Sequence, residues 1–294
     1  MSSRNSGLTM VLLAGCLAAA SLSFARGSQN GQGAQNQPGQ QPTTTNKDQK
    51  PAESGSTLSV PSPPASAEED AAVKAFQTMP SADLPKKIEA GEDFLKKYPE
   101  SKYRPTVYSA LVVAYIQTGN TEKAFEVGDT EVALKPDDVQ TMAILSQTLP
   151  RAMSASTPEP EKRLAKAETY AKRAIEITPT IPKPEGMADQ NFVAAKNETL
   201  TMAHSGLGLV YFRRGKYTEA IPELEQSVKI DPNPTPDPVN LYVLAMANQK
   251  TSHFDEAANV FTKCAAIPGK LQTVCKNGAD EAKKQSSTQL SAPK

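Results

Sequence analysis

Few side chains in this sequence could do acid–base, nucleophilic or metal chemistry. The chain has 2 His and 3 Cys, and the histidines are His204 and His253. Neither lies near a Ser or Cys in a nucleophile motif, and the sequence has no Gly-rich phosphate loop, H-E-x-x-H pair or dinucleotide fingerprint. Segment 205–208 (SGLG) is rich in glycine, but it lies within a predicted helix, where small residues allow close packing. The sequence therefore predicts a protein that is not an enzyme and needs no cofactor.

The cysteines and one histidine allow two kinds of chemistry, metal binding and disulfide formation. His253, Cys264 and Cys275 follow one another at intervals of eleven residues. Zinc sites instead use closely spaced pairs of ligands, so we expect no metal site. Cys264 is expected late in one helix and Cys275 early in the next, with a Pro-Gly turn between them. In an exported chain, which meets an oxidising compartment, these two thiols are expected to pair as a disulfide.

Residues 1–25 favour export. An apolar run, LTMVLLAGCLAAASLSF, follows Arg4 and ends in small residues, as expected for a secretory signal peptide. Two processing routes remain open. Cleavage after segment 23–25 (SFA), by the signal peptidase that requires small residues there, would leave a periplasmic protein. Segment 13–16 (LAGC) instead matches a bacterial lipobox, and lipidation of Cys16 would anchor the protein to the outer membrane.

Residues 26–67 are rich in Gly, Gln, Asn, Pro, Ser and Thr and contain few apolar side chains. Such a segment buries too little surface to offset the entropy of ordering, so we expect a disordered linker with a reach of roughly 35 Å. The chain has 32 basic and 32 acidic residues, and this balance gives no indication of nucleic-acid binding. No second apolar run is long enough to span a bilayer, so a membrane contact is expected only through an N-terminal lipid.

Residues 201–234 carry the clearest structural pattern, TMAHSGLGLVYFRRGKYTEAIPELEQSVKIDPNP. Periodic apolar residues predict one helix on each side of a turn at Gly215, and segment 231–232 (DP) predicts the end of the second helix. The Leu-Gly pair at 207–208, the aromatic Tyr211 and the terminal Asp-Pro-Asn resemble a tetratricopeptide repeat, a unit of about 34 residues. Since one such helix pair cannot bury its apolar face alone, the resemblance implies stacked neighbours.

Further copies of the pattern lie on both sides of this repeat. We expect repeats at 105–138 and 238–268, and a split copy at 138–181. The helices of the split copy, expected at 138–149 and 161–177, are separated by a Pro-rich insertion, PRAMSASTPEPEK. In the first of these repeats Gly128 replaces the usual large residue, which predicts looser packing of its second helix.

The resemblance implies an all-α fold, a right-handed α-solenoid of tetratricopeptide helix pairs over residues 68–284. Because the last pair would otherwise expose an apolar face, we expect residues 271–284 to form a capping helix, followed by a disordered tail at 285–294. Segment 98–101 (YPES) is similar to segments of family members in the bacterial envelope, such as outer-membrane assembly lipoproteins and periplasmic coordinators of the division machinery.

The family also suggests where a partner would bind, because the first helices of successive repeats line a concave groove. The Lys, Asn and Arg pattern with which chaperone-binding members clamp a peptide carboxylate is missing. The groove is expected to be mostly apolar, with Met and aromatic side chains that adapt to an irregular partner. The expected groove residues are Val113, Ile116, Met202, Leu209, Phe212, Arg213, Tyr242 and Met246.

These patterns together predict a non-catalytic scaffold in the bacterial cell envelope that binds a protein or peptide. Truncation of Phe212 or Tyr242 is expected to weaken binding and barely change stability, because groove side chains face solvent. One alternative is a peptidoglycan- or carbohydrate-associated envelope protein, which would need convergent carboxylates or exposed aromatics on one face. The other is a structural subunit that self-associates.

Overall fold

The structure, a computed structural model, describes residues 66–80 and 83–291, and this part of the chain is all-α. The predicted signal peptide, Cys16 and almost all of the predicted linker lie outside the described residues. The helices are α1 (Ala67–Thr78), α2 (Leu84–Lys97), α3 (Arg104–Gln117), α4 (Thr121–Leu134), α5 (Val139–Ala152), α6 (Pro160–Ile177), α7 (Asp189–Arg213), α8 (Tyr217–Ile230), α9 (Pro238–Lys250), α10 (Phe254–Ala265) and α11 (Gln272–Ser291), with a 3-10 turn, η1 (Thr178–Thr180), after α6.

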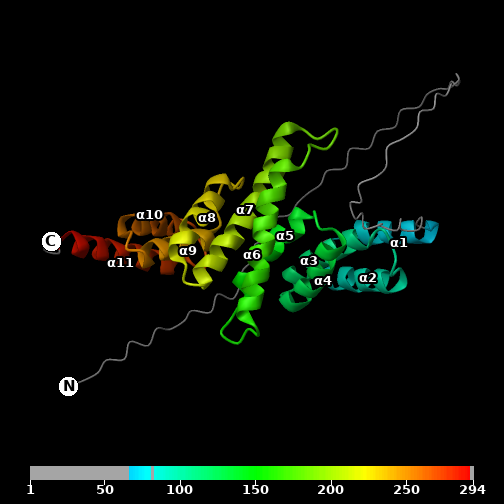
Figure 1. Ribbon diagram of the computed structural model, residues 1–294, viewed down its shortest axis with the longest axis horizontal. Coiled ribbons are helices and arrows are strands. Elements are labelled where there is room, and N and C mark those ends of the chain that lie inside the picture. Colours follow the sequence, from blue (N-terminus) through cyan, green and yellow to red (C-terminus); the bar gives the residue numbers. More distant parts are fainter. Residues whose placement is uncertain (1–65, 81–82, 292–294) are drawn as a thin grey trace, which may run out of the picture.

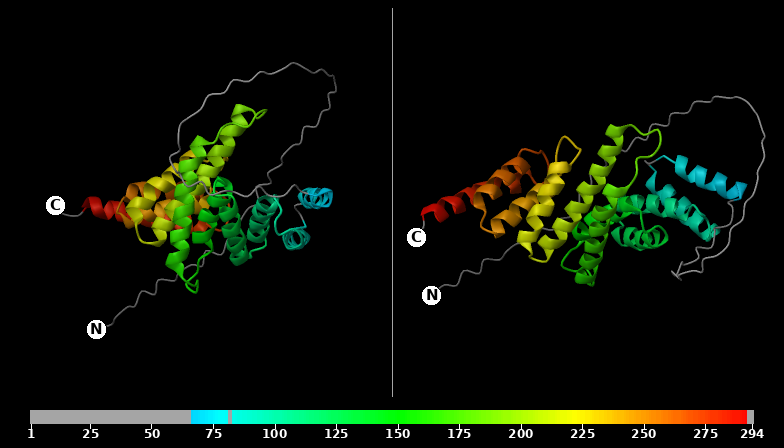
Figure 2. Two further views of the ribbon diagram at one scale, coloured as in Figure 1. Left: turned by 45° about the vertical axis from the view of Figure 1, so that its right-hand side comes forward. Right: turned by 45° about the horizontal axis from the view of Figure 1, so that its top comes forward.

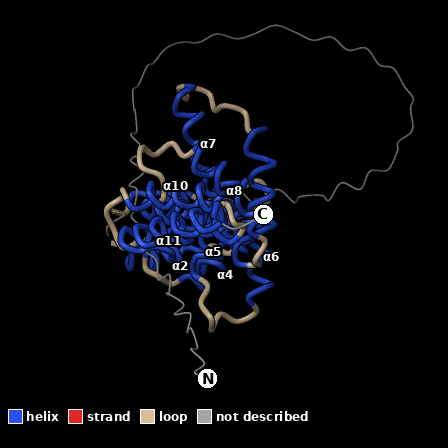
Figure 3. The backbone as a smooth tube through the Cα atoms, turned by 90° about the vertical axis from the view of Figure 1, so that its left-hand side faces the viewer, coloured by secondary structure: helices blue, strands red, loops and turns tan. Residues whose placement is uncertain are grey.

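The helices form an elongated row in chain order, from α1 at one end to α11 at the other (Figure 1). Each helix packs on its neighbours in the chain, as expected for stacked helix pairs (Figure 2). The long helix α7 crosses the middle of the row (Figure 1), and its N-terminal end projects beyond the other helices (Figure 3). The all-α fold of tetratricopeptide-like helix pairs is therefore confirmed.

Local sequence explains the turns inside the helix pairs. Gly119 and Gly215 adopt φ angles of 78° and 73°, which suit glycine, and they separate α3 from α4 and α7 from α8. Asn120 then begins α4 by accepting a hydrogen bond from the Lys123 amide. Asp138 begins α5 in the same way, so the positions at which these helices start follow from ordinary turn and capping residues.

Two helices end later than the sequence predicts. Helix α5 continues through Pro150 to Ala152, because a proline in the last turn removes one N–H donor without preventing the helical backbone. Helix α11 continues to Ser291, so the prediction of a disordered tail from residue 285 is wrong over 285–291. Its later turns are held to the row, since Gln285 accepts a hydrogen bond from Gln249 and Ser286 donates one to Asp255.

Close contact between helices depends on small residues at what we call the central joint, the contact of α5 with α7 around Ser146 and Gly206. A methyl group added at Gly206 would lie 2.6 Å from the Ser146 backbone carbon. Pro150 cannot donate to the Ser146 carbonyl, and this carbonyl lies against Gly206. The prediction that the SGLG segment serves close helix packing is confirmed here.

A second contact, which we call the N-terminal joint, is that of α3 and α4 with α5 around Gly128 and Glu131. A methyl group added at Gly128 would lie 2.7 Å from Leu145 Cδ1. The prediction that Gly128 loosens α4 is therefore wrong, because Leu145 of α5 fills the space that a larger residue would take. The contact of α4 with α5 is nevertheless less extensive than that of α7 with α5.

Candidate partner-binding surface

The eight predicted groove residues do not lie on one continuous open face. Ile116 and Leu209 are only 6% and 5% exposed and pack inside different core clusters. Placing these two residues on an open groove was wrong, because the repeat pattern identifies a helix face without showing how closely the next helix covers it. Val113 on α3, by contrast, is 39% exposed.

The aromatic residues of the predicted set are half-buried. The Phe212 ring packs edge-on against Tyr217, with centroids 5.3 Å apart, and contacts the cluster that contains Leu224. The Tyr242 ring packs in the same way against Phe261, at 6.0 Å. Both rings therefore support helix packing, and the expectation that their truncation leaves stability unchanged does not fit these contacts.

The other three residues are also partly covered. Met202 packs against a central cluster that includes Met142, and Met246 packs against the C-terminal cluster around Phe261. Arg213 donates a hydrogen bond from Nη2 to the Met153 carbonyl at 3.0 Å. Burial lowers the pKa of its guanidinium group.

A partly buried polar network that the sequence did not reveal connects α5, α7 and α9. Arg151 Nη2 lies 2.6 Å from Asp237 Oδ2 and donates to Asn240 Oδ1 at 2.8 Å and to Ser205 Oγ at 3.1 Å. Asn240 in turn donates to Ser227 Oγ of α8 at 3.1 Å. Because Arg151 was expected in the insertion, and charged residues are normally exposed, sequence reasoning missed this role.

The insertion between α5 and α6 borders a small pocket. Its lining includes Glu122, Met153 and Thr157, and its empty volume is approximately 180 Å³, including space open to solvent. Arg163 closes one side with a bidentate ion pair to Glu122, at 2.7 Å for both contacts, and this pair lowers the pKa of Glu122. The pocket is smaller than the roughly 300 Å³ at which common small-molecule sites begin, so it does not favour a small-molecule site.

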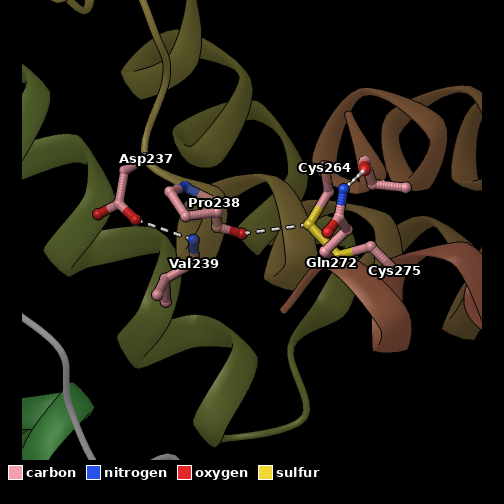
Figure 4. The surroundings of a disulfide bond; sticks show 7 residues. Asp237, Pro238, Val239, Cys264, Gln272 and Cys275 are labelled. Atoms are coloured by element: carbon pink, nitrogen blue, oxygen red, sulfur yellow. Dashed lines mark hydrogen bonds between the residues drawn. A yellow bond between two sulfur atoms is a disulfide. The ribbon is translucent and has the colours of Figure 1, made fainter. Parts of the chain in front are cut away.

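The C-terminal end of the row contains the two cysteines. Cys264 of α10 and Cys275 at the start of α11 are paired, and their Cα atoms lie 5.7 Å apart, within the range that a disulfide requires. The pair lies close to the start of α9, where the Pro238 carbonyl oxygen is 3.6 Å from Cys264 Sγ (Figure 4). Gln272 also donates to the Ala265 carbonyl at 3.2 Å, which holds the start of α11 against α10.

Two further observations concern only residues 66–80 and 83–291. In this part of the chain no helix has both the length and the apolar character needed to cross a bilayer. The same residues contain no group of three or more His, Cys, Asp or Glu side chains arranged to hold a metal ion.

Comparison with known families identifies one segment. Residues 202–234 match the tetratricopeptide repeat model, and they correspond to the second half of α7 and to α8. This segment is therefore a tetratricopeptide repeat, as its sequence predicts. Such repeats stack to form extended binding surfaces, and the proteins built from them generally serve as non-catalytic scaffolds for other proteins. No curated protein matches the chain in sequence.

Several solved structures are similar to this chain at low sequence identity. TTC0263, a thermophilic TPR protein of Thermus thermophilus, is 19% identical with a TM-score of 0.46, over 73% of this chain and 98% of that one. A MamA RS-1 double mutant is 16% identical with a TM-score of 0.49, over 68% and 93%. PilW, a widely conserved type IV pilus biogenesis factor, is 15% identical with a TM-score of 0.48, over 78% and 97%.

These likenesses are too distant to indicate a function for this chain. The fold assignment rests on the helix pairs described above and on the matched repeat. The exported, envelope-located type of tetratricopeptide protein stays a prediction from the sequence.

Proposed function

We propose that this protein is a non-catalytic scaffold of the bacterial cell envelope that binds a partner protein or peptide. The observation that carries the proposal is the tetratricopeptide repeat at 202–234, set in a row of similar helix pairs. Stacked helix pairs present an extended surface suited to a macromolecular partner. Export is supported by the apolar N-terminal segment and by two cysteines placed to form a disulfide.

Within this proposal Val113 is the best candidate for a partner contact. It is one of the predicted groove residues, lies on the first helix of its pair and is 39% exposed. Leu134 offers a matched control, because it is similarly exposed, at 43%, and apolar but lies on the second helix, α4. Phe212 and Tyr242 are half-buried and also pack in the core, so they would contribute less to such a contact.

The test is affinity capture from envelope extract with the full mature chain and with the variants Val113→Asp and Leu134→Asp. The unchanged chain and Leu134→Asp are expected to capture the same protein, whereas Val113→Asp should lose it, because a buried charge weakens an apolar contact. Circular dichroism first establishes that both variants are folded. We call the surface formed by the first helices of the pairs the first-helix surface. Equal capture by all three chains would reject this surface as the binding site, and capture of peptidoglycan in place of protein would reject the proposed scaffold function.

A further inference from the structure

Glu131, near the end of α4, is a fully buried carboxylic acid at the N-terminal joint. Its exposed fraction is 0%, and neither carboxylate oxygen has a hydrogen-bond partner in the protein. Acidic side chains are almost never fully buried without a partner, since an unpaired charge away from water is costly. The position of Glu131 therefore calls for a physical explanation.

The groups around Glu131 do not favour a negative charge. Asp138, at the start of α5, places a second carboxylate beside it and raises its pKa by more than the Ser109 hydroxyl of α3 lowers it. Lys135 is the cation that acts on Glu131, but its side chain is 51% exposed and its Nζ lies 3.4 Å from Asp138 Oδ2. Tyr170 of α6 is near enough for the charge of Glu131 to raise the pKa of its hydroxyl group.

The polar side chains of α6 near Glu131 interact with other groups of α4 and of the loop that follows it. The Tyr170 hydroxyl donates to Asp129 Oδ1 at 2.7 Å, and Lys166 forms an ion pair with the same carboxylate. Arg173 donates from Nε to the Pro136 carbonyl in the loop between α4 and α5. None of these α6 side chains donates to Glu131, whose two carboxylate oxygens have no hydrogen-bond partner.

These surroundings favour the protonated acid. Burial, reinforced by the charge of Asp138, raises the pKa of Glu131 from 4.5 to about 8. A protonated Glu131 is neutral, so it adds no second negative charge beside Asp138. An ionised Glu131 would place a buried negative charge beside the partly exposed Asp138 carboxylate, at the contact that is less extensive than the central joint.

We propose that Glu131 is a proton-dependent latch, whose protonated carboxyl keeps α3 and α4 closed on α5 and whose deprotonation opens the N-terminal joint. Opening would move α1 to α4 away from the rest of the row and expose part of the apolar cluster that spans the joint. The helices on the two sides of the joint would then no longer present one continuous surface. This conformational device does not depend on the identity of any partner.

Hydrogen–deuterium exchange on the full chain tests the proposal at about pH 6 and about pH 9, on either side of the Glu131 pKa of about 8. After correction for the intrinsic effect of pH on exchange, protection in α4 and the first turns of α5 should fall about ten-fold or more at the higher pH. Protection in α9 and α10 provides the internal reference and should stay constant. Glu131→Gln should abolish the fall, whereas Glu126→Gln, a matched change at an exposed position of α4, should retain it.

Two results would overturn the latch. One is equal protection of α4 at both pH values in the unchanged chain, and the other is an unchanged pH effect in Glu131→Gln. Carbon-13 NMR of the Glu131 carboxyl in the unchanged chain gives a readout that does not depend on folding of a variant. A titration midpoint within about one unit of the ordinary value of 4.5 would also reject the proposal.

Discussion

At the central joint α5 meets α7 through Ser146 and Gly206 with no room for another methyl group, whereas at the N-terminal joint α5 meets α4 around a buried carboxyl. The first contact is stabilised by close packing and by the Arg151 network, which extends to α9. The second combines a close contact at Gly128 with the unpaired Glu131. The row of helices is therefore expected to be least stable near its N-terminal end.

The largest expected effect is the pH dependence that Glu131 imposes. Because its pKa is about 8 in the folded chain and has its ordinary value of 4.5 in the unfolded chain, the folded state binds the extra proton between these values. The contribution of Glu131 to the free energy of unfolding is therefore fully present below about pH 4.5. It is lost progressively as the pH rises from about 4.5 to about 8, by up to about 5 kcal/mol.

Urea unfolding across this pH range measures the effect, and Glu131→Gln should flatten the profile. Ion pairs that lower a carboxyl pKa, such as that of Glu122 with Arg163, have the opposite effect. Their contribution to the free energy of unfolding is lost as the pH falls below about 4.5. A wild-type profile that rises between pH 5 and pH 8 would contradict the assignment of Glu131 as the dominant group.

A cavity in the C-terminal half should cost nearly as much. Leu224 is fully buried between α7 and α8, and Leu224→Ala is expected to lower the free energy of unfolding by roughly 2–5 kcal/mol. Phe212→Ala should cost less, because that ring is only half-buried beside the same cluster, but its effect should be measurable in thermal unfolding. If Phe212→Ala leaves the melting temperature unchanged, its contact with Tyr217 contributes nothing to the fold.

The cysteine pair should strengthen the C-terminal end. A bond between Cys264 and Cys275, eleven residues apart, is expected to contribute roughly 3 kcal/mol by restricting the unfolded chain. Non-reducing peptide mapping of protein taken from its own envelope should recover the two cysteine peptides linked, and reduction should lower the urea midpoint. Recovery of two free thiols would contradict the predicted disulfide and would weaken the argument for export.

The smallest expected effect is the change in the free energy of unfolding when a glycine at each joint is replaced by alanine. Gly206→Ala would press a methyl group against the Ser146 backbone, which cannot move aside, so a loss of roughly 1–3 kcal/mol is expected. Gly128→Ala meets only side-chain atoms of Leu145 and no backbone, and the helix propensity of Ala, better by about 1 kcal/mol, offsets part of that clash. If both substitutions lower the free energy of unfolding equally in chemical denaturation, the two joints do not differ in rigidity.

Much of the fold could be predicted because local sequence determines the turns. The repeat at 201–234 contains a complete set of helix, turn and stop residues, and α7, α8 and their Gly215 turn follow it. The extension of α5 was missed because Pro150 was interpreted as a helix end. The extension of α11 was missed because its last turns depend on contacts with α9 and α10.

The candidate surface was predictable only in part, because exposure depends on neighbouring helices. Repeat alignment placed Val113 and Leu209 in equivalent surroundings, yet one is exposed and the other is buried beside α9. The sequence gave no indication that Glu131 is buried or that Arg151 links three helices, since charged residues on helices normally face water. Their roles become visible only when α4 packs on α5 and α5 on α7.

Site-specific photo-crosslinking in living cells tests the central claim most directly, namely that the first-helix surface binds another protein. A photoreactive residue is placed at position 113 or, as the matched exposed control, at position 134. The account predicts a discrete product with a different protein from position 113 and none from position 134. The same product from both positions, or a product that joins two copies of this chain, would contradict it.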